Sequence, residues 1–149
     1  MTFPPLNRHQ VREKALQAIF QLKSNDELDK ETAIRMARLS EQEDLNEDEE
    51  LPNESYLNEL VNGVIEKQEE INEQIRPYLK KWTFERLPRT DGIILQLAVY
   101  EMVFVEESEV PSKVALNEAI ELAKEYCDES SRKFINGVLS NLMSNIENP

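Results

Sequence analysis

The segment PSKVALNEAIELAKEYCDESSRKFINGVL, residues 111–139, predicts two amphipathic helices joined by a short polar turn. In each helix, apolar side chains recur at spacings of three and four residues, which places them on one face. These side chains are Leu116, Ala119, Ile120, Ala123 and Tyr126 in the first helix, and Phe134, Val138, Leu139 and Leu142 in the second. Two faces this apolar require the rest of the chain as their packing partner.

Polar residues before each helix are the expected N-caps. Ser112 is the expected cap of the first helix, because Pro111 prevents the helix from extending backwards. Ser130 or Ser131 is the expected cap of the second helix.

The first helix of the chain is predicted over residues 7–22, where Asn7 and Gln10 have the spacing of a capping box. Its apolar face consists of Val11, Ala15, Ala18, Ile19 and Leu22. Arg8, Arg12 and Lys14 lie outside that face, close to the helix start, where they oppose the helix dipole. They indicate either a solvated helix start or a site at which a polyanion supplies the compensating charge.

Further helical patterns follow along the chain. A second helix is expected over residues 28–39, with Ala33, Ile34 and Ala37 inward, and a third begins after Asn53. The expected buried positions of this third pattern and its continuation are Tyr56, Leu57, Leu60, Val61, Val64, Ile65, Ile71, Ile75, Tyr78 and Leu79. Pro77 is expected to break the pattern, and Trp82 after it is expected in the core.

The segment GIILQLAVYEMVF, residues 92–104, is apolar nearly all round, so it predicts a central helix covered on most sides. A strand here would have no second strand-like run to pair with. The sequence therefore predicts an all-α fold, a single-domain bundle of six or seven helices over residues 1–149.

Composition limits the class of protein. A chain of 149 residues with 40% hydrophobic residues, 3 glycines and 7 prolines is typical of one globular domain. There is no 18-residue apolar run and no signal-peptide pattern, so no membrane partner is expected. Cys127 is the single cysteine, which excludes an internal disulfide and favours a cytoplasmic location.

Residue counts also argue against catalysis. One cysteine and one histidine, His9, cannot build a zinc site from Cys and His ligands. The glycines are scattered, which excludes a phosphate-binding glycine loop, and a Ser-His-Asp arrangement would depend on His9 near the chain terminus. We therefore expect no enzyme activity, no cofactor and no metal.

The net charge of -13 is unevenly distributed. Residues 26–55 hold 12 acidic and 3 basic residues, and residues 40–53 predict an acidic, solvated loop. Residues 1–25 hold four cations against Glu13 alone. Acidity normally argues against a nucleic-acid partner, but this argument weakens when most of the acid lies in one segment.

The motif NEAIELAK followed by KFINGVL resembles the NusB family of bacterial transcription antitermination factors. The AVYE of residues 98–101 and the REKALQAIFQL of residues 12–22 resemble two further segments of that family, so the similarity spans residues 8–142. The resemblance implies an all-helical fold of two packed halves. It also implies binding to boxA, a single-stranded RNA element of ribosomal RNA operon leaders, together with NusE, a ribosomal small-subunit protein. The pair helps RNA polymerase to read through terminators.

By this resemblance, the arginine-rich N-terminal motif of the family falls on Arg8, His9, Gln10 and Arg12, with Lys14 close by. The motif is thin here, in the sense that it holds few cations, because His9 and Gln10 stand where family members often have further arginines. A second RNA-contacting place falls on Ser130, Arg132, Lys133 and Phe134. A cation pair beside an aromatic ring suits single-stranded RNA, although Phe134 also fits a core position.

The resemblance places the NusE surface on the middle helices, around Tyr100 and Glu101. Family members commonly have arginine near Gly92 and Gln96, and both positions are uncharged here, so either a partner contact or a surface ion pair is absent. The alternative function is a helical adapter that binds NusE with little RNA affinity of its own, which the net charge and the thin arginine motif favour.

Overall fold

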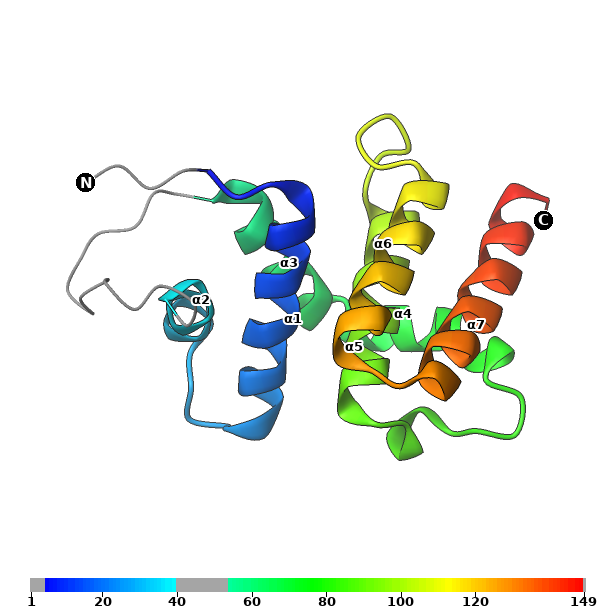
Figure 1. Cartoon of the computed structure of the whole chain (residues 1–149), viewed down its shortest axis with the longest axis horizontal. Helices are drawn as coiled ribbons and strands as arrows, with labels where there is room; N and C mark the ends of the chain where they lie inside the picture. Colours follow the sequence, from blue (N-terminus) through cyan, green and yellow to red (C-terminus); the bar gives the residue numbers. More distant parts are fainter. Residues whose placement is uncertain (1–4, 40–53, 149) are drawn as a thin grey trace. The chain divides into compact units, whose positions relative to one another are not determined.

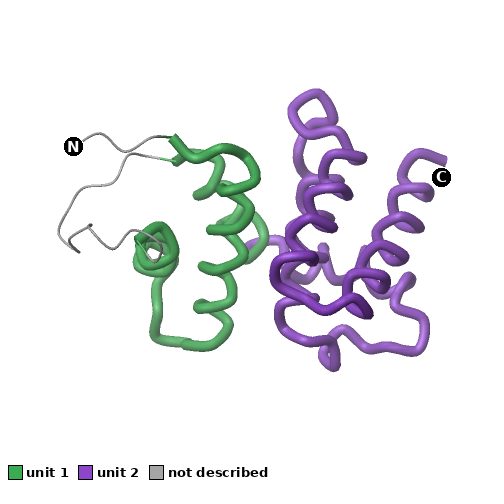
Figure 2. The backbone as a smooth tube through the Cα atoms, viewed as in Figure 1, with its two compact units in different colours: residues 1–65 green, residues 66–149 purple. Residues whose placement is uncertain are grey.

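The computed structural model of the protein describes residues 5–39 and 54–148, and within them it contains seven α-helices, two short 3-10 helices and no strand (Figure 1). The all-α prediction is therefore confirmed. The chain divides into two compact units, Met1–Ile65 and Glu66–Pro149 (Figure 2). The predicted acidic loop at 40–53, with the expected cap Asn53, lies outside the described residues.

The first unit is built from α1 (Arg8–Ser24), α2 (Lys30–Leu39) and α3 (Ser55–Glu66), with α1 packed against α2. The capping box is confirmed: the Asn7 side chain accepts from the Gln10 backbone N–H at 2.8 Å, and the Gln10 side chain accepts from the Asn7 N–H at 3.0 Å. The buried apolar side chains of this unit are Val11, Ala15, Leu16, Ala18, Ile19, Ala33, Ile34, Ala37, Leu57, Leu60, Val61 and Val64. Of the predicted inward positions, Leu22, Tyr56 and Ile65 are only partly buried.

The second unit is organised around α5 (Arg89–Phe104), which packs against α4 (Gln68–Ile75), α6 (Ser112–Tyr126) and α7 (Glu129–Glu147). All residues from 91 to 102 are buried, so the prediction of a central helix is confirmed. The expected break at Pro77 is also confirmed, because α4 gives way there to the 3-10 helix η1 (Arg76–Tyr78). The Asn145 side chain of α7 donates to the Tyr78 hydroxyl, which ties η1 to α7.

The expected caps of α6 and α7 are wrong. Ser112 is the first residue of α6, and its backbone N–H and its hydroxyl both donate to Glu107 Oε2 at 3.1 Å. The cap of α7 is Asp128, whose side chain accepts from the Ser131 N–H at 2.8 Å. Because the aspartate precedes both serines and already accepts from the third N–H of the helix, the serines become first-turn residues.

Trp82 is not in the core: 49% of its surface is exposed. It follows Lys80, whose φ of 59° is in the left-handed region, and its own N–H donates to the Leu79 carbonyl in a tight turn at 3.1 Å. This turn separates Trp82 from the buried face to which Leu79 belongs. Tyr126, predicted on the inner face of α6, is also exposed, and Ala115 and Leu122 extend that face instead.

Candidate nucleic-acid interface

Arg8 is the exposed cation at the start of α1. Its guanidinium lies 3.8 Å from the centre of the Tyr56 ring, a cation–π distance that fixes the side chain over α3. Beside it, the Leu6 backbone N–H donates to Glu54 Oε1 at 3.1 Å. These contacts hold the residues before α1 against the start of α3, with the arginine accessible from solvent.

Arg12 and Lys14 are buried, with exposed fractions of 3% and 5%. Arg12 lies next to Val11 and Lys14 next to Ala15, and α1 is buried over much more of its circumference than one amphipathic stripe. Direct phosphate contact needs an accessible cation, so both residues leave the set of candidate RNA contacts. This is a correction of the prediction from the sequence.

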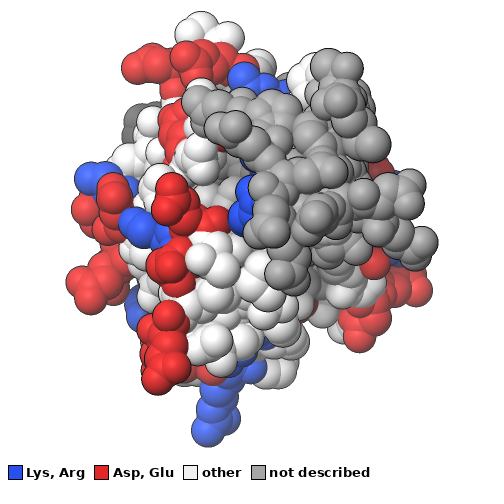
Figure 3. Space-filling view, turned by 90° about the vertical axis from the view of Figure 1, so that its left-hand side faces the viewer, with Lys and Arg blue, Asp and Glu red and all other residues white. Residues whose placement is uncertain are grey.

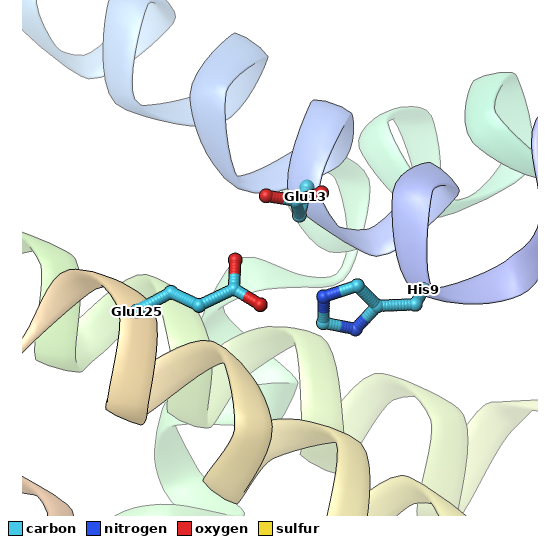
Figure 4. A group of neighbouring side chains, drawn as sticks. All are labelled: His9, Glu13 and Glu125. Atoms are coloured by element: carbon cyan, nitrogen blue, oxygen red, sulfur yellow. The ribbon is translucent and has the colours of Figure 1, made fainter.

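His9 and Glu13 project from successive turns of α1, and both are partly buried (Figure 4). His9 is therefore less accessible than Arg8, while Gln10 on the next position is exposed. On the face drawn in Figure 3, acidic side chains lie among the basic ones, and the described residues form no broad basic patch there. The N-terminal candidate site is reduced to Arg8, with a secondary contribution from His9.

The start of α7 forms the second candidate site. Lys133 is exposed and pairs with Glu129 one turn earlier at 3.4 Å, while Arg132 is partly buried. An exposed pair of this kind contributes little to stability, so an RNA phosphate can replace the glutamate as the partner of Lys133. The helix dipole favours an anion at this end, where the Asp128 carboxylate already accepts from the Ser131 N–H.

A cavity of about 370 Å³ opens beside this helix start. It is lined by Trp82, Leu87, Pro88, Asp91, Asp128, Ser130, Ser131 and Phe134. Phe134 is partly buried and lines this cavity, so it is not enclosed in the core of the unit. Reasoning from the sequence missed Trp82 as a site residue. The available signal was its place in KKWTFER, residues 80–86, where charged neighbours and the lack of periodicity argue for an exposed ring.

Cys127 donates its S–H at 3.3 Å to Oδ1 of Asp91, a residue that lines the cavity. Burial raises the pKa of the Cys127 thiol to about 12, and the hydrogen bond to Asp91 and the charge of that carboxylate add to the effect. Since the thiolate is the nucleophile, the raised pKa slows the reaction of this cysteine at neutral pH.

We expect iodoacetamide at pH 8 to modify Cys127 in the native protein at least about 100-fold more slowly than an ordinary thiol. The same chain in guanidinium chloride is the control, because unfolding exposes the thiol. Asp91→Asn removes the carboxylate charge, lowers the thiol pKa and accelerates the native reaction. A native rate within tenfold of the denatured rate would contradict the assignment.

The middle of α5 is buried, including the positions that the family resemblance assigned to partner contact. Gln96 is fully buried, and its Nε2 donates to Asn72 Oδ1 of α4 at 2.9 Å, so this position does not carry a surface ion pair. Tyr100 and Glu101, the expected partner contacts, are also buried. Tyr100 stacks on Phe104 with ring centres 5.7 Å apart, and Val103 is the exposed apolar residue of this turn. Direct contact through Tyr100 or Glu101 therefore does not fit their positions.

Among the described residues, none of the helices has both the length and the apolar character needed to cross a membrane.

The described residues define an all-helical protein whose candidate site combines cations with aromatic rings. Residues 9–144 match the NusB family, and the chain belongs to that family. The resemblance read from the motifs is confirmed. So is the interpretation that the protein is an antitermination factor and not an enzyme.

Similar proteins and solved structures also support membership in the NusB family. The chain is 47% identical to the transcription antitermination protein NusB of Enterococcus faecalis over 149 residues, which covers 99% of this chain and 96% of the relative. It is 46% identical to the protein of that name from Lactiplantibacillus plantarum, covering 96% and 99%. The T. maritima NusB structure is 30% identical with a TM-score of 0.77 and covers 95% of this chain and 93% of its own.

A further similar structure is described as antitermination factors NusB and NusE in complex with dsRNA. The matched chain has a TM-score of 0.73, and the match covers 93% of this chain and 96% of that chain. Its sequence identity is 24%, so this likeness establishes the fold.

Proposed function

We propose that this protein binds boxA-type single-stranded RNA of ribosomal RNA operon leaders together with NusE, and thereby promotes read-through by RNA polymerase. The observation that carries the proposal is the start of α7, where Arg132 and Lys133 stand beside a cavity lined by Phe134 and Trp82. Single-stranded RNA is recognised by just this pairing of phosphate-binding cations with rings on which bases stack. Membership in the NusB family supports the role in antitermination.

The charge at the site predicts weak binding by the protein alone. Three accessible or partly accessible cations remain in the proposed footprint, namely Arg8, Arg132 and Lys133. Each phosphate contact contributes roughly -0.7 to the slope of log affinity against log salt concentration for single strands, so we expect a slope of about -2. We therefore expect that the protein binds RNA tightly only when NusE binds too, because the binding of NusE and the binding of RNA then strengthen each other.

Charge reversal tests the footprint. Lys133→Glu and Arg8→Glu are expected to weaken binding of a labelled boxA-type RNA by the complex with NusE, each by about tenfold, because each exchanges a phosphate contact for a repulsion. Lys124→Glu is the matched control: Lys124 is also an exposed lysine of the second unit that pairs with an acid of its own helix, Glu121 at 3.2 Å, but it lies in the last turn of α6. Binding that is unchanged in both footprint variants would show that the footprint is wrong.

For NusE we propose the C-terminal half of α5 and the loop after it. Val103 is exposed there, and Glu106, Glu107 and Glu109 follow it as exposed acids. An apolar contact flanked by acids is complementary to a basic ribosomal protein. Because Tyr100 and Glu101 are buried, we expect them to position this surface from below, and we expect Val103 to make the direct contact with NusE.

The alternative function, an adapter that binds NusE with little RNA affinity, is favoured by one specific observation. The burial of Arg12 and Lys14 removes two cations from an N-terminal motif that is already thin, in a chain of net charge -13. The two functions differ in whether this protein adds RNA affinity to NusE.

A further inference from the structure

A separate pocket of about 430 Å³ opens on the second unit along α4. Its lining residues are Glu69, Glu70, Asn72, Glu73 and Arg76, which come from α4 and the first position of η1. The pocket shares no lining residue with the cavity at the start of α7, and it includes none of the cations of the proposed RNA footprint. Its chemistry is therefore independent of the RNA contacts.

The lining of this pocket is negatively charged, because three of its residues are exposed glutamates. The Arg76 guanidinium does not balance them, since it pairs with one of these glutamates at 3.3 Å and with Glu85 outside the pocket at 3.0 Å. Glu70 pairs with Lys67 only at 3.9 Å, and Glu69 has no ion-pair partner within the described ranges 5–39 and 54–148. The pocket therefore attracts a positively charged group.

Asn72 is the buried member of the lining, with 9% of its surface exposed. Its Oδ1 accepts from Gln96 Nε2 of α5 at 2.9 Å, so the carbonyl side of the amide is directed toward α5. The Nδ2 group branches from the same carbon in the other direction, toward the pocket, and no described residue accepts a hydrogen bond from it. A buried donor without a partner carries a desolvation cost, which an acceptor on a ligand removes.

A ligand that fits this pocket must combine a positive charge with a hydrogen-bond acceptor. A metal ion or a polyamine supplies the charge alone, because a protonated amine has no lone pair to accept with. A lysine or arginine within a polypeptide supplies both features, since its side chain is the cation and the adjacent backbone carbonyl is the acceptor. The arrangement therefore favours a basic peptide segment over a small cation.

We propose that this pocket docks a basic segment of a partner protein. The lysine or arginine side chain of that segment pairs with Glu69 and Glu70, and its backbone carbonyl accepts from Asn72 Nδ2. Gln96 is a positioning residue, because its hydrogen bond holds the Asn72 amide in the orientation that presents Nδ2. The site consists of other residues than the surface proposed for NusE, and it does not depend on RNA binding.

The test is a titration of the ¹⁵N-labelled full chain, followed by NMR, with the capped peptide Gly-Arg-Gly-Arg-Gly. Putrescine is the matched control, because it also carries two positive charges but no acceptor. We expect the peptide to bind about fivefold more tightly than putrescine and to shift the side-chain amide resonance of Asn72, which putrescine leaves in place. Equal affinities, or an Asn72 amide resonance that the peptide leaves unchanged, would overturn the proposal.

Two variants test the two halves of the site. Glu69→Gln is expected to weaken peptide binding about fivefold, whereas Glu147→Gln, at an exposed glutamate of α7, is expected to leave it unchanged. Equal effects of these two substitutions would overturn the role of the acidic lining.

The double variant Asn72→Leu with Gln96→Leu removes the pocket donor without leaving a buried acceptor unsatisfied. We expect it to bind putrescine as the wild type does and to lose the preference for the peptide. If the two amides served only the packing of α4 on α5, the double variant would change stability and keep that preference.

Repeating the titration with the complex of this protein and NusE separates the site from the NusE surface. We expect NusE to leave peptide binding unchanged. Loss of peptide binding in the complex would assign the pocket to NusE and overturn a site for a separate partner. A failure of RNA binding would overturn the proposed function and leave this site standing.

Discussion

Ile94→Ala is expected to destabilise the protein by about 2–5 kcal/mol, the range for a large buried aliphatic side chain replaced by alanine. Ile94 has no exposed surface and lies in the middle of α5, the helix against which α4, α6 and α7 all pack. The cavity left behind is bordered by packed helices that cannot collapse into it independently. Because a domain of this size has roughly 5–15 kcal/mol of stability in total, this loss is a large fraction of it.

Chemical denaturation followed by circular dichroism measures this change. Val103→Ala is the matched control, since it also truncates an aliphatic side chain of α5, at an exposed position. Its expected effect is within about 0.5 kcal/mol. Equal effects of the two substitutions would contradict the placement of α5 as the central helix. Ile94→Ala should lose RNA binding at a lower temperature than the wild type does, because α7 and its cavity depend on packing against α5.

Gln96→Leu is expected to cost about 1–3 kcal/mol, although leucine is more apolar than glutamine. The substitution removes the donor to Asn72 Oδ1 in a buried α4–α5 contact, and an unsatisfied buried acceptor carries the full desolvation penalty. Asn72→Leu in the same background removes that acceptor as well. The double variant is therefore expected to be more stable than Gln96→Leu alone.

The control is Gln74→Leu, an exposed position of α4, with an expected change within about 0.5 kcal/mol. Thermal melts of the wild type, of the single variants Gln96→Leu and Asn72→Leu, and of the double variant complete the cycle. A Gln96→Leu variant as stable as the wild type would show that the hydrogen bond to Asn72 contributes nothing.

The elements with a strong local pattern were predictable from the sequence. The capping box of Asn7 and Gln10 depends on two side chains three residues apart, and the break at Pro77 follows from the missing N–H of proline. The continuous apolar character of residues 92–104 predicted that α5 is central, because only a helix covered on most sides can bury all of it.

Features that depend on neighbours distant in sequence were not predictable. Periodicity indicates one buried face, but it does not indicate that Arg12 and Lys14 are covered as well. The cap of α7 is a local feature that the sequence analysis assigned to Ser130 or Ser131, but Asp128 lies one position outside the helix and accepts from the Ser131 N–H. Trp82 was expected in the core because it is hydrophobic. After the left-handed turn at Lys80 it lies instead at the cavity beside α7.

Fluorescence anisotropy of a labelled boxA-type RNA, titrated with this protein with and without NusE at two salt concentrations, is the most direct measurement of the proposed function. We predict binding that strengthens when NusE is present and weakens with salt, at a slope near -2 for this protein's own contribution. Binding to NusE without any gain in RNA affinity at either salt concentration would contradict the RNA-binding role and support the adapter function.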